Sequence, residues 1–108
     1  MRNICHRDIK PDNIILVSET TNVVKLIDFG VAHQFDPAIG MSGIVGTILF
    51  MAPEVIKKGS HHYFQKSDIY SIGVILYLLL TVKAPYKHKS KQHLMYLVAT
   101  GQYNELAL

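Results

Sequence analysis

The sequence offers little sulfur chemistry. Its 108 residues contain no tryptophan and a single cysteine, Cys5. One cysteine cannot form an internal disulfide, which favours a reducing, intracellular and cytoplasmic location. It also excludes a zinc site built from several thiolates. Because Cys5 lies in an apolar approach to a polar loop, we interpret it as a buried structural residue rather than a nucleophile.

Acidic residues and long apolar runs are also scarce. Eight Asp and Glu stand against eleven Lys and Arg, and the formal net charge is +3. The basic excess is spread between residues 57 and 91 without a run of five, which favours a solvated surface over a nucleic-acid interface. The most apolar stretch, residues 69–82, is too short for a membrane span of about 20 residues, and no apolar run resembles a signal peptide. We therefore expect neither a membrane span nor a nucleic-acid partner.

Apolar side chains are abundant, at 49% of the residues. This share argues against a disordered chain and allows one domain with a core. Two β-prone runs, 14–17 and 23–27, flank a polar turn at 18–22 and predict a β-hairpin. Residues 31–47 contain three glycines and a proline without a clear period, and they predict a loop.

Three helices are predicted in the second half of the chain. Residues 53–58 predict a short helix with a proline in its first turn. Ser67 is a suitable N-cap for a helix over 68–82, which is apolar on every face and is therefore expected in the middle of a core. Residues 90–100 predict an amphipathic helix whose apolar residues are Leu94, Tyr96, Leu97 and Val98. The predicted fold class is α+β, mainly α.

Three short strings occur in a fixed order: HRDIKPDN at residues 6–13, DFG at 28–30 and APE at 52–54. At average residue usage, such an ordered match arises by chance roughly once in 10¹⁰ cases or less often. The strings resemble the catalytic loop, the metal-binding loop and the end of the activation segment of eukaryotic protein kinases. The resemblance extends from Ile4 to about Tyr103. It implies a serine/threonine protein kinase that uses ATP and Mg²⁺.

The resemblance implies roles for five residues near the transferred phosphate. Asp8 would orient the substrate hydroxyl and accept its proton, and Lys10 would place an ammonium group beside the transferring phosphate of ATP. Asn13 and Asp28 would bind Mg²⁺ through hard oxygen atoms. In the family, the threonine that matches Thr47 bridges the catalytic aspartate and lysine, here Asp8 and Lys10. Lys10 also favours a serine or threonine of a protein substrate as the acceptor.

Other matches imply support rather than chemistry. Ile15 matches the aliphatic residue beneath the adenine of ATP. One aspartate, Asp68, matches a buried residue that holds the backbone of the catalytic loop. The histidine of the first string is implied to pack beneath the phenylalanine of the second. The implied structural group is His6, Phe29, Gly30, Glu54 and Asp68.

Regulation is predicted on the activation segment. Arg7 directly precedes the catalytic aspartate, and in the family such an arginine receives a phosphate from this segment. Residues 31–47 offer two hydroxyl groups, on Ser42 and Thr47, and Thr47 already has an implied structural role. Ser42 is therefore the candidate phosphorylation site, with an unmodified loop serine as the alternative.

Several departures from the family pattern bear on the chain as written. Ile48 stands where proline is commonest, no Gly-rich loop or strand lysine precedes the first string, and no arginine follows Arg7 to pair with Glu54. We expect residues 1–108 to be a partial kinase domain: the large, C-terminal lobe with its hairpin, without the N-terminal lobe and the last helices. Such a chain is expected to be inactive alone and to need the missing lobe or a partner chain.

Residues 28–35 and 45–54 look most like the calcium/calmodulin-dependent kinase kinases. The main alternative to an active enzyme is a non-catalytic, pseudokinase-like remnant that binds a partner through exposed core surface. The intact acidic, basic and amide residues of the first two strings favour descent from an active enzyme. The missing ATP-binding lobe favours inactivity of this chain. A nucleic-acid binder, supported only by mild basicity, is the third hypothesis.

Overall fold

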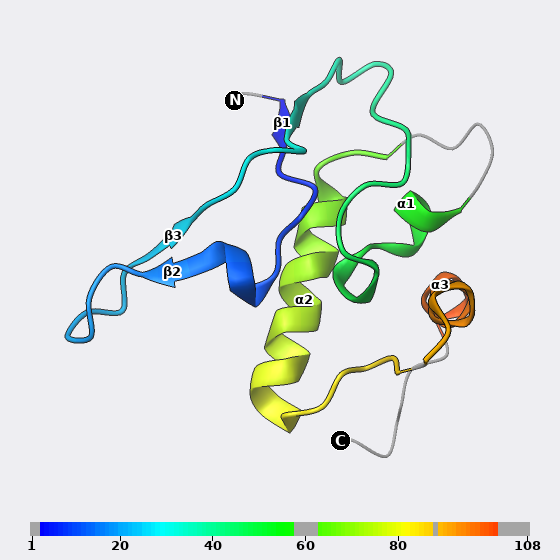
Figure 1. The fold of residues 1–108 in the computed structure, drawn as a ribbon. Coiled ribbons are helices and arrows are strands. Elements are labelled where there is room, and N and C mark those ends of the chain that lie inside the picture. Colours follow the sequence, from blue (N-terminus) through cyan, green and yellow to red (C-terminus); the bar gives the residue numbers. More distant parts are fainter. Residues whose placement is uncertain (1–2, 58–62, 88, 102–108) are drawn as a thin grey trace.

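The computed structural model describes residues 3–57, 63–87 and 89–101 (Figure 1). Within these ranges, helices combine with two small antiparallel sheets, as the predicted α+β class requires. The hairpin lies on one side of the longest helix, and the two shorter α-helices lie on the other (Figure 1). In chain order the elements are β1 (Ile4–Cys5), η1 (Pro11–Asn13), β2 (Ile14–Leu16), β3 (Val24–Leu26), β4 (His33–Gln34), η2 (Ile48–Phe50), α1 (Pro53–Ile56), α2 (Lys66–Thr81) and α3 (Lys91–Thr100).

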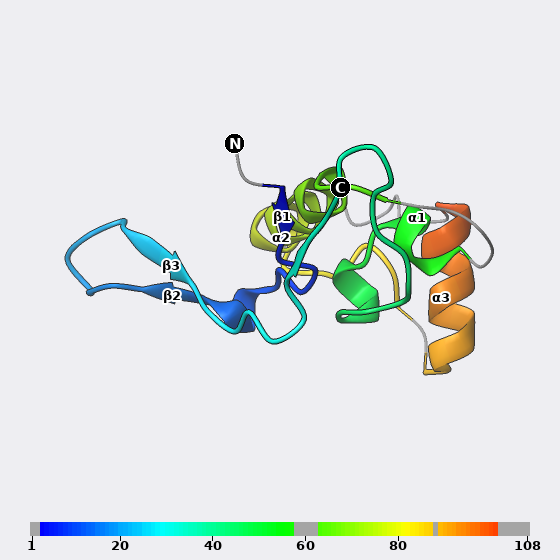
Figure 2. The same ribbon diagram turned by 90° about the horizontal axis from the view of Figure 1, so that it is seen from above.

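The predicted hairpin is present as β2 and β3. The strands are antiparallel, with Ile14 opposite Leu26 and Leu16 opposite Val24. One further backbone bond, from Val17 N–H to the Val23 carbonyl, closes the turn at 3.0 Å. The hairpin projects away from the helices (Figure 2). Only its base is therefore anchored to the rest of the described chain.

The prediction of a loop over 31–47 is wrong at His33–Gln34. These residues form β4, which pairs with β1 so that Ile4 lies opposite Gln34 and Cys5 opposite His33. The Phe35 N–H extends the pairing by donating to the Asn3 carbonyl at 2.8 Å. A two-residue strand has no detectable alternation, so only its distant partner identifies it.

The long helix differs from its prediction in two respects. Ser67 is not the N-cap: α2 begins at Lys66, and the Ser67 hydroxyl donates to the Phe64 carbonyl at 2.9 Å. The helix also does not lie in the middle of a core. Its buried residues are Ser67, Ser71 and Val74, whereas Leu79 and Leu80 are 75% and 72% exposed. Within the described ranges only one face of α2 is covered, because the other elements pack against that side.

The core lies between β1, α1, α3 and the segment that leads into α1. Its buried members include Cys5, Phe35, Met51, Ile56 and Val98. Helix α3 matches the prediction over 90–100 and is capped as helices commonly are: the Ser90 side chain accepts from the His93 N–H, and Gly101 adopts φ +71°. Tyr96, predicted to be on the apolar face, is exposed.

The short helix predicted over 53–58 is observed as α1, with its proline at the start. The last residue of the predicted range, residue 58, lies outside the described residues. In the part of the chain that the structure covers, no helix has both the length and the apolar character needed to cross a membrane.

Candidate active site

The backbone of the loop after β1 is held by one carboxylate. Asp68, in the first turn of α2, accepts hydrogen bonds from the backbone N–H groups of His6 at 2.8 Å and Arg7 at 3.0 Å. Arg7 has φ +70°, a conformation that is unfavourable for a non-glycine residue. Two bonds to a charged acceptor offset this strain, so α2 determines the path of the loop.

The His6 ring lies inside the protein and both its nitrogens are engaged. Its Nδ1 accepts from the Asp8 N–H at 3.1 Å, so Nε2 carries the proton and donates to the Ile27 carbonyl at 2.9 Å. The ring also meets Phe29 edge to face, with centroids 4.8 Å apart. These contacts connect the first string to the second, and they favour a structural role for His6 over acid–base chemistry.

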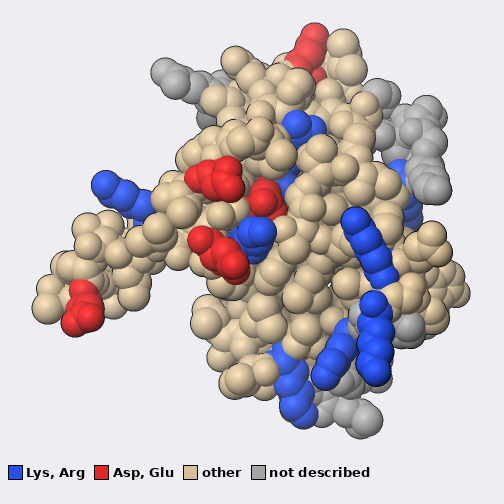
Figure 3. All heavy atoms as spheres, viewed as in Figure 1, with Lys and Arg blue, Asp and Glu red and all other residues tan. Residues whose placement is uncertain are grey.

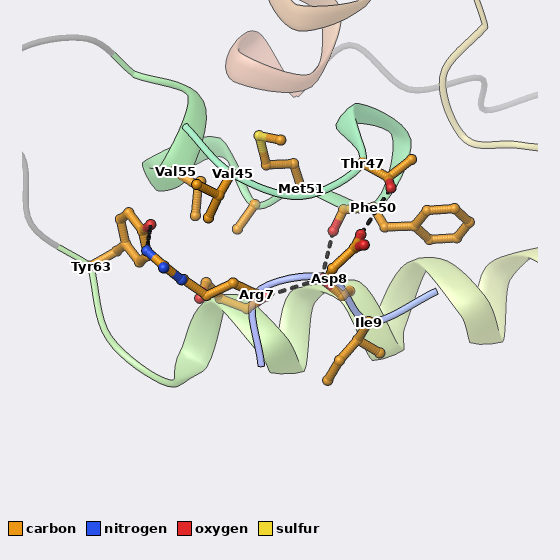
Figure 4. A pocket seen from close by; sticks show the side chains of 12 residues that line it. Arg7, Asp8, Ile9, Val45, Thr47, Phe50, Met51, Val55 and Tyr63 are labelled. Carbon is orange, nitrogen blue, oxygen red and sulfur yellow. Dashed lines mark hydrogen bonds between the residues drawn. The ribbon is translucent and has the colours of Figure 1, made fainter. Parts of the chain in front are cut away.

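Three side chains meet where the resemblance implied a bridge, and Figure 4 shows two of them, Asp8 and Thr47. The Thr47 hydroxyl donates to Asp8 Oδ1 at 2.8 Å and accepts from Lys10 Nζ at 3.0 Å. Lys10 Nζ also lies 3.8 Å from Asp8 Oδ2. The approach depends on Gly46, which has φ +108° and whose added Cβ would collide with the Arg7 carbonyl oxygen. A carboxylate and an ammonium group are thus presented together at the loop surface.

Asn13 and Asp28, the candidate metal ligands, lie on adjacent backbone. The Ile27 N–H donates to the Asn13 carbonyl at 2.9 Å, which places residue 28 next to residue 13. The Asn13 amide nitrogen donates to the Asp8 carbonyl at 2.8 Å, which leaves its side-chain oxygen available as a ligand. Asp28 has φ +58° and accepts from the Gly30 N–H at 3.2 Å.

These donors fit magnesium. Mg²⁺ is commonly bound by one or two protein oxygens, with phosphates and water completing the octahedron. Among the described residues, no three His, Cys, Asp or Glu side chains gather closely enough to form a metal site by themselves. The donor set here, one amide oxygen and one carboxylate, therefore suits a metal that arrives with a nucleotide.

The remaining predicted site residues lie apart from this group. Ile15 on β2 and Phe29 are 48% and 57% exposed, so the side where adenine is implied to bind is open. Ser42 is exposed. Glu54 is half-buried, and no described residue forms a hydrogen bond or ion pair with it.

A small cavity lies behind the catalytic loop (Figure 4). Its lining includes Asp8, Thr47, Phe50 and Ser71, and its volume is about 10 Å³. That is about the minimum for one water molecule, so the space is part of the packing rather than a nucleotide site. Ser71 of α2 donates to the Phe50 carbonyl at 2.6 Å and holds η2 against the helix.

Tyr63 is a site residue that the sequence analysis missed. It is buried, and its backbone pairs with Met41 through two 2.8 Å hydrogen bonds. Its hydroxyl donates to the Gly43 carbonyl at 2.9 Å and accepts from Arg7 Nη1 at 3.3 Å. Arg7 Nε donates to the Val31 carbonyl at 2.7 Å. Two adjacent aromatic residues after a polar run, Tyr63 and Phe64, were the one available signal, and they do not reveal these partners.

Cys5 is fully buried in β1. Its Sγ lies 3.5 Å from the Ser67 Oγ, and burial raises the pKa of the thiol to about 11. A thiol that stays protonated is a poor nucleophile. This environment favours the structural interpretation of Cys5.

Comparisons with known proteins identify the family. The family model "Protein kinase domain" matches residues 1–106. The chain is 40% identical over 105 residues to calcium-dependent protein kinase 4 of Plasmodium berghei (strain Anka), which covers 94% of this chain and 19% of the relative. It is 38% identical over 102 residues to sperm motility kinase 2B of Mus musculus, covering 94% of this chain and 20% of the relative. The chain thus spans about a fifth of the length of these relatives.

A loop that presents an aspartate and a lysine beside two oxygen donors is the arrangement expected in the protein kinase class. The chain belongs to the eukaryotic protein kinase superfamily, among relatives that include calcium-dependent protein kinases. The resemblance to calcium/calmodulin-dependent kinase kinases remains a prediction.

Proposed function

We propose that the protein transfers the γ-phosphoryl group of ATP to a serine or threonine hydroxyl of a protein. The observation that carries this proposal is the Asp8–Thr47–Lys10 hydrogen-bonded group beside Asn13 and Asp28. As the acceptor oxygen bonds to the γ-phosphorus, its proton passes to the Asp8 carboxylate and the bond to the leaving ADP oxygen breaks. Lys10 would contribute positive charge beside the moving group.

Nucleotide binding would use the two oxygen donors and the hairpin. Asn13 and Asp28 would hold Mg²⁺, which supplies neutralisation of charge on the phosphates. Ile15, at the exposed base of β2, would contact the adenine. The described residues would then form the C-terminal side of a cleft, and the open surface at Ile15 and Phe29 would face the other lobe or a partner chain. A complete cleft is required for positioning, so we expect little activity from these residues alone.

Substitution of Asp8 tests the proposal in the full-length protein that carries this chain. Asp8→Asn should lower kcat by about two to four orders of magnitude with little change in nucleotide affinity, because the loss is confined to the transition state. Asp28→Asn should weaken Mg–ATP binding as well as the rate. Asp12→Asn, the same change at an exposed position of the same loop, is the matched control.

The outcome separates the enzyme from the non-catalytic alternative. Loss of turnover in Asp8→Asn but not in Asp12→Asn supports phosphotransfer. Wild-type turnover in Asp8→Asn contradicts the assignment of the catalytic residue. Absence of both Mg–ATP binding and phosphotransfer in the full-length protein favours the pseudokinase-like remnant.

Phosphorylation of Ser42 remains a proposal, and the Tyr63 contacts offer an alternative way to order the activation segment. Two of the five Arg7 guanidinium N–H groups already bond to Val31 and Tyr63, so a phosphate on Ser42 would share Arg7 with these contacts. Tyr63 already links Arg7 to the activation segment at Gly43. Mass spectrometry of the active protein that finds Ser42 unmodified would leave Tyr63 as the residue that orders this segment.

A further inference from the structure

The segment between α2 and α3 concentrates positive charge. Lys83, Lys87, Lys89 and Lys91 are all exposed. No Asp or Glu occurs anywhere from residue 69 to residue 104. Figure 3 shows lysine and arginine side chains gathered at the lower right of one face, while acidic side chains gather on the same face near the base of the hairpin. On this face the lysine-rich segment is therefore separate from the acidic cluster.

A groove with an apolar floor lies within this basic segment. Its volume is about 640 Å³, within the range of ligand-binding clefts. Leu49, Tyr86 and Leu94 contribute apolar surface, and Lys83 and Lys87 line it as well. We call this site the lysine groove. Among the described residues, none of its lysines forms an ion pair with a carboxylate, so their charge is available to a ligand.

The lysine groove begins near the candidate active site along the chain. Leu49 belongs to η2, whose preceding residue, Thr47, donates to Asp8. Two residues of chain span at most about 7 Å, so the groove begins close to the catalytic carboxylate. An extended peptide whose hydroxyl lies at Asp8 would reach the groove with side chains only a few positions away.

We propose that the lysine groove binds an acidic stretch of the protein substrate, with glutamate, aspartate or phosphorylated residues beside the target hydroxyl. This inference rests on the proposed function for its biological meaning, but binding can be measured without catalysis. Charge complementarity identifies the occupant: a basic stretch would be repelled by Lys83 and Lys87, whereas a carboxylate or phosphate would pair with them. The apolar floor adds room for a neighbouring apolar side chain.

Fluorescence anisotropy with labelled peptides tests the proposal. The probe is a short peptide with one serine flanked by glutamates and a leucine, and the comparison peptide has lysines in place of the glutamates. The full chain should bind the acidic peptide only, and binding should weaken as ionic strength rises from about 0.05 to about 0.5 M. Lys83→Glu combined with Lys87→Glu should weaken it about tenfold. Lys25→Glu, on the exposed hairpin strand β3, is the matched control and should bind as the wild type does.

Kinetics in the full-length protein distinguish the two proposals. The double substitution should raise KM for the acidic substrate with little change in kcat, because neither lysine touches the reacting atoms. Phosphotransfer that prefers the basic peptide would overturn the groove assignment and leave the proposed function standing. Acidic-peptide binding without any phosphotransfer would overturn the proposed function and leave the groove assignment standing. Equal weakening by Lys25→Glu, or single-stranded RNA that competes equally well for the groove, would show a non-specific polyanion surface and overturn the inference.

Discussion

The catalytic loop, residues 6–13, and the hairpin that follows it are placed by different forces. The loop is tied to distant segments by side chains: Asp68 from α2, Thr47 from the activation segment and the Ile27 carbonyl. The β2–β3 hairpin is held by its own ladder, and its side chains from Leu16 to Leu26 are exposed. Part-buried polar contacts between remote segments therefore determine the geometry of the site, whereas backbone pairing between nearby residues determines the register of the hairpin.

Helix α2 positions the catalytic loop without burying much apolar surface of its own. Helix α2 contributes few buried apolar residues in the described chain, yet it supplies Asp68, Ser67 and Ser71 to the site. The helix therefore places these three polar side chains at fixed positions along its length. A substitution at one of these anchors should have a larger effect than one at an exposed leucine of the same helix.

The largest effect is expected from Asp68→Ala. Two backbone N–H groups would lose a charged acceptor, and Arg7 would lose the contact that holds its left-handed backbone. We expect the free energy of unfolding to fall by about 3 kcal/mol. Urea unfolding measures this loss. Asp12→Ala, at an exposed position, should change it by less than about 0.5 kcal/mol, and equal losses in the two variants would contradict the anchor role.

Cys5 should make stability depend on alkaline pH. Its thiol pKa is raised in the folded protein from 9.0 to about 11, so folding favours the protonated form. The stabilisation is present below pH 9 and is lost as the pH rises towards 11. Complete loss corresponds to roughly 2–3 kcal/mol. Urea unfolding of the wild type and of Cys5→Ala should converge over this interval; a constant difference between them would contradict the assignment.

Tyr63→Phe tests the link between Arg7 and the activation segment. Removal of the hydroxyl deletes a bond to the Gly43 carbonyl and one from Arg7, and we expect a loss of about 1–2 kcal/mol. Amide hydrogen exchange should accelerate around Met41, whose N–H pairs with the Tyr63 carbonyl. Tyr96→Phe, on the exposed side of α3, is the control. Unchanged exchange at residue 41 would show that backbone pairing alone holds the segment.

The smallest effect is expected in the hairpin turn. Within the described ranges, the exposed Ser18 hydroxyl makes hydrogen bonds only to the neighbouring Thr20 and Thr21 side chains, so Ser18→Ala should change stability by less than about 0.5 kcal/mol. The same substitution at Ser71, which is buried and donates to the Phe50 carbonyl, should be destabilising by about 1–2 kcal/mol. Thermal unfolding of both variants measures the contrast. If Ser18→Ala lowered stability as much as Ser71→Ala does, the proposed difference between the hairpin and the catalytic loop would be contradicted.

Local patterns predicted the elements that depend on neighbouring residues. The hairpin followed from two β-prone runs around a polar turn, and α3 followed from its periodicity with Ser90 before it and Gly101 after it. The contacts of Thr47 and Asp68 also follow the family pattern, although the catalytic roles themselves remain proposals. The predictions were wrong where contacts with distant segments matter. Ser67 lies inside α2 rather than at its N-cap, and His33–Gln34 form a strand because they pair with β1.

The sequence by itself determined the family and the identity of the chemical groups, because the order of Asp8, Lys10, Asn13 and Asp28 is written directly in the chain. It also determined the apolar character of α2. Only the tertiary structure decided which face of α2 is covered, how Tyr63 joins Arg7 to the activation segment, and that Leu49 and Lys83 line one groove. Contacts between residues so far apart in the chain depend on how whole segments pack, and neither periodicity nor local propensity encodes that packing.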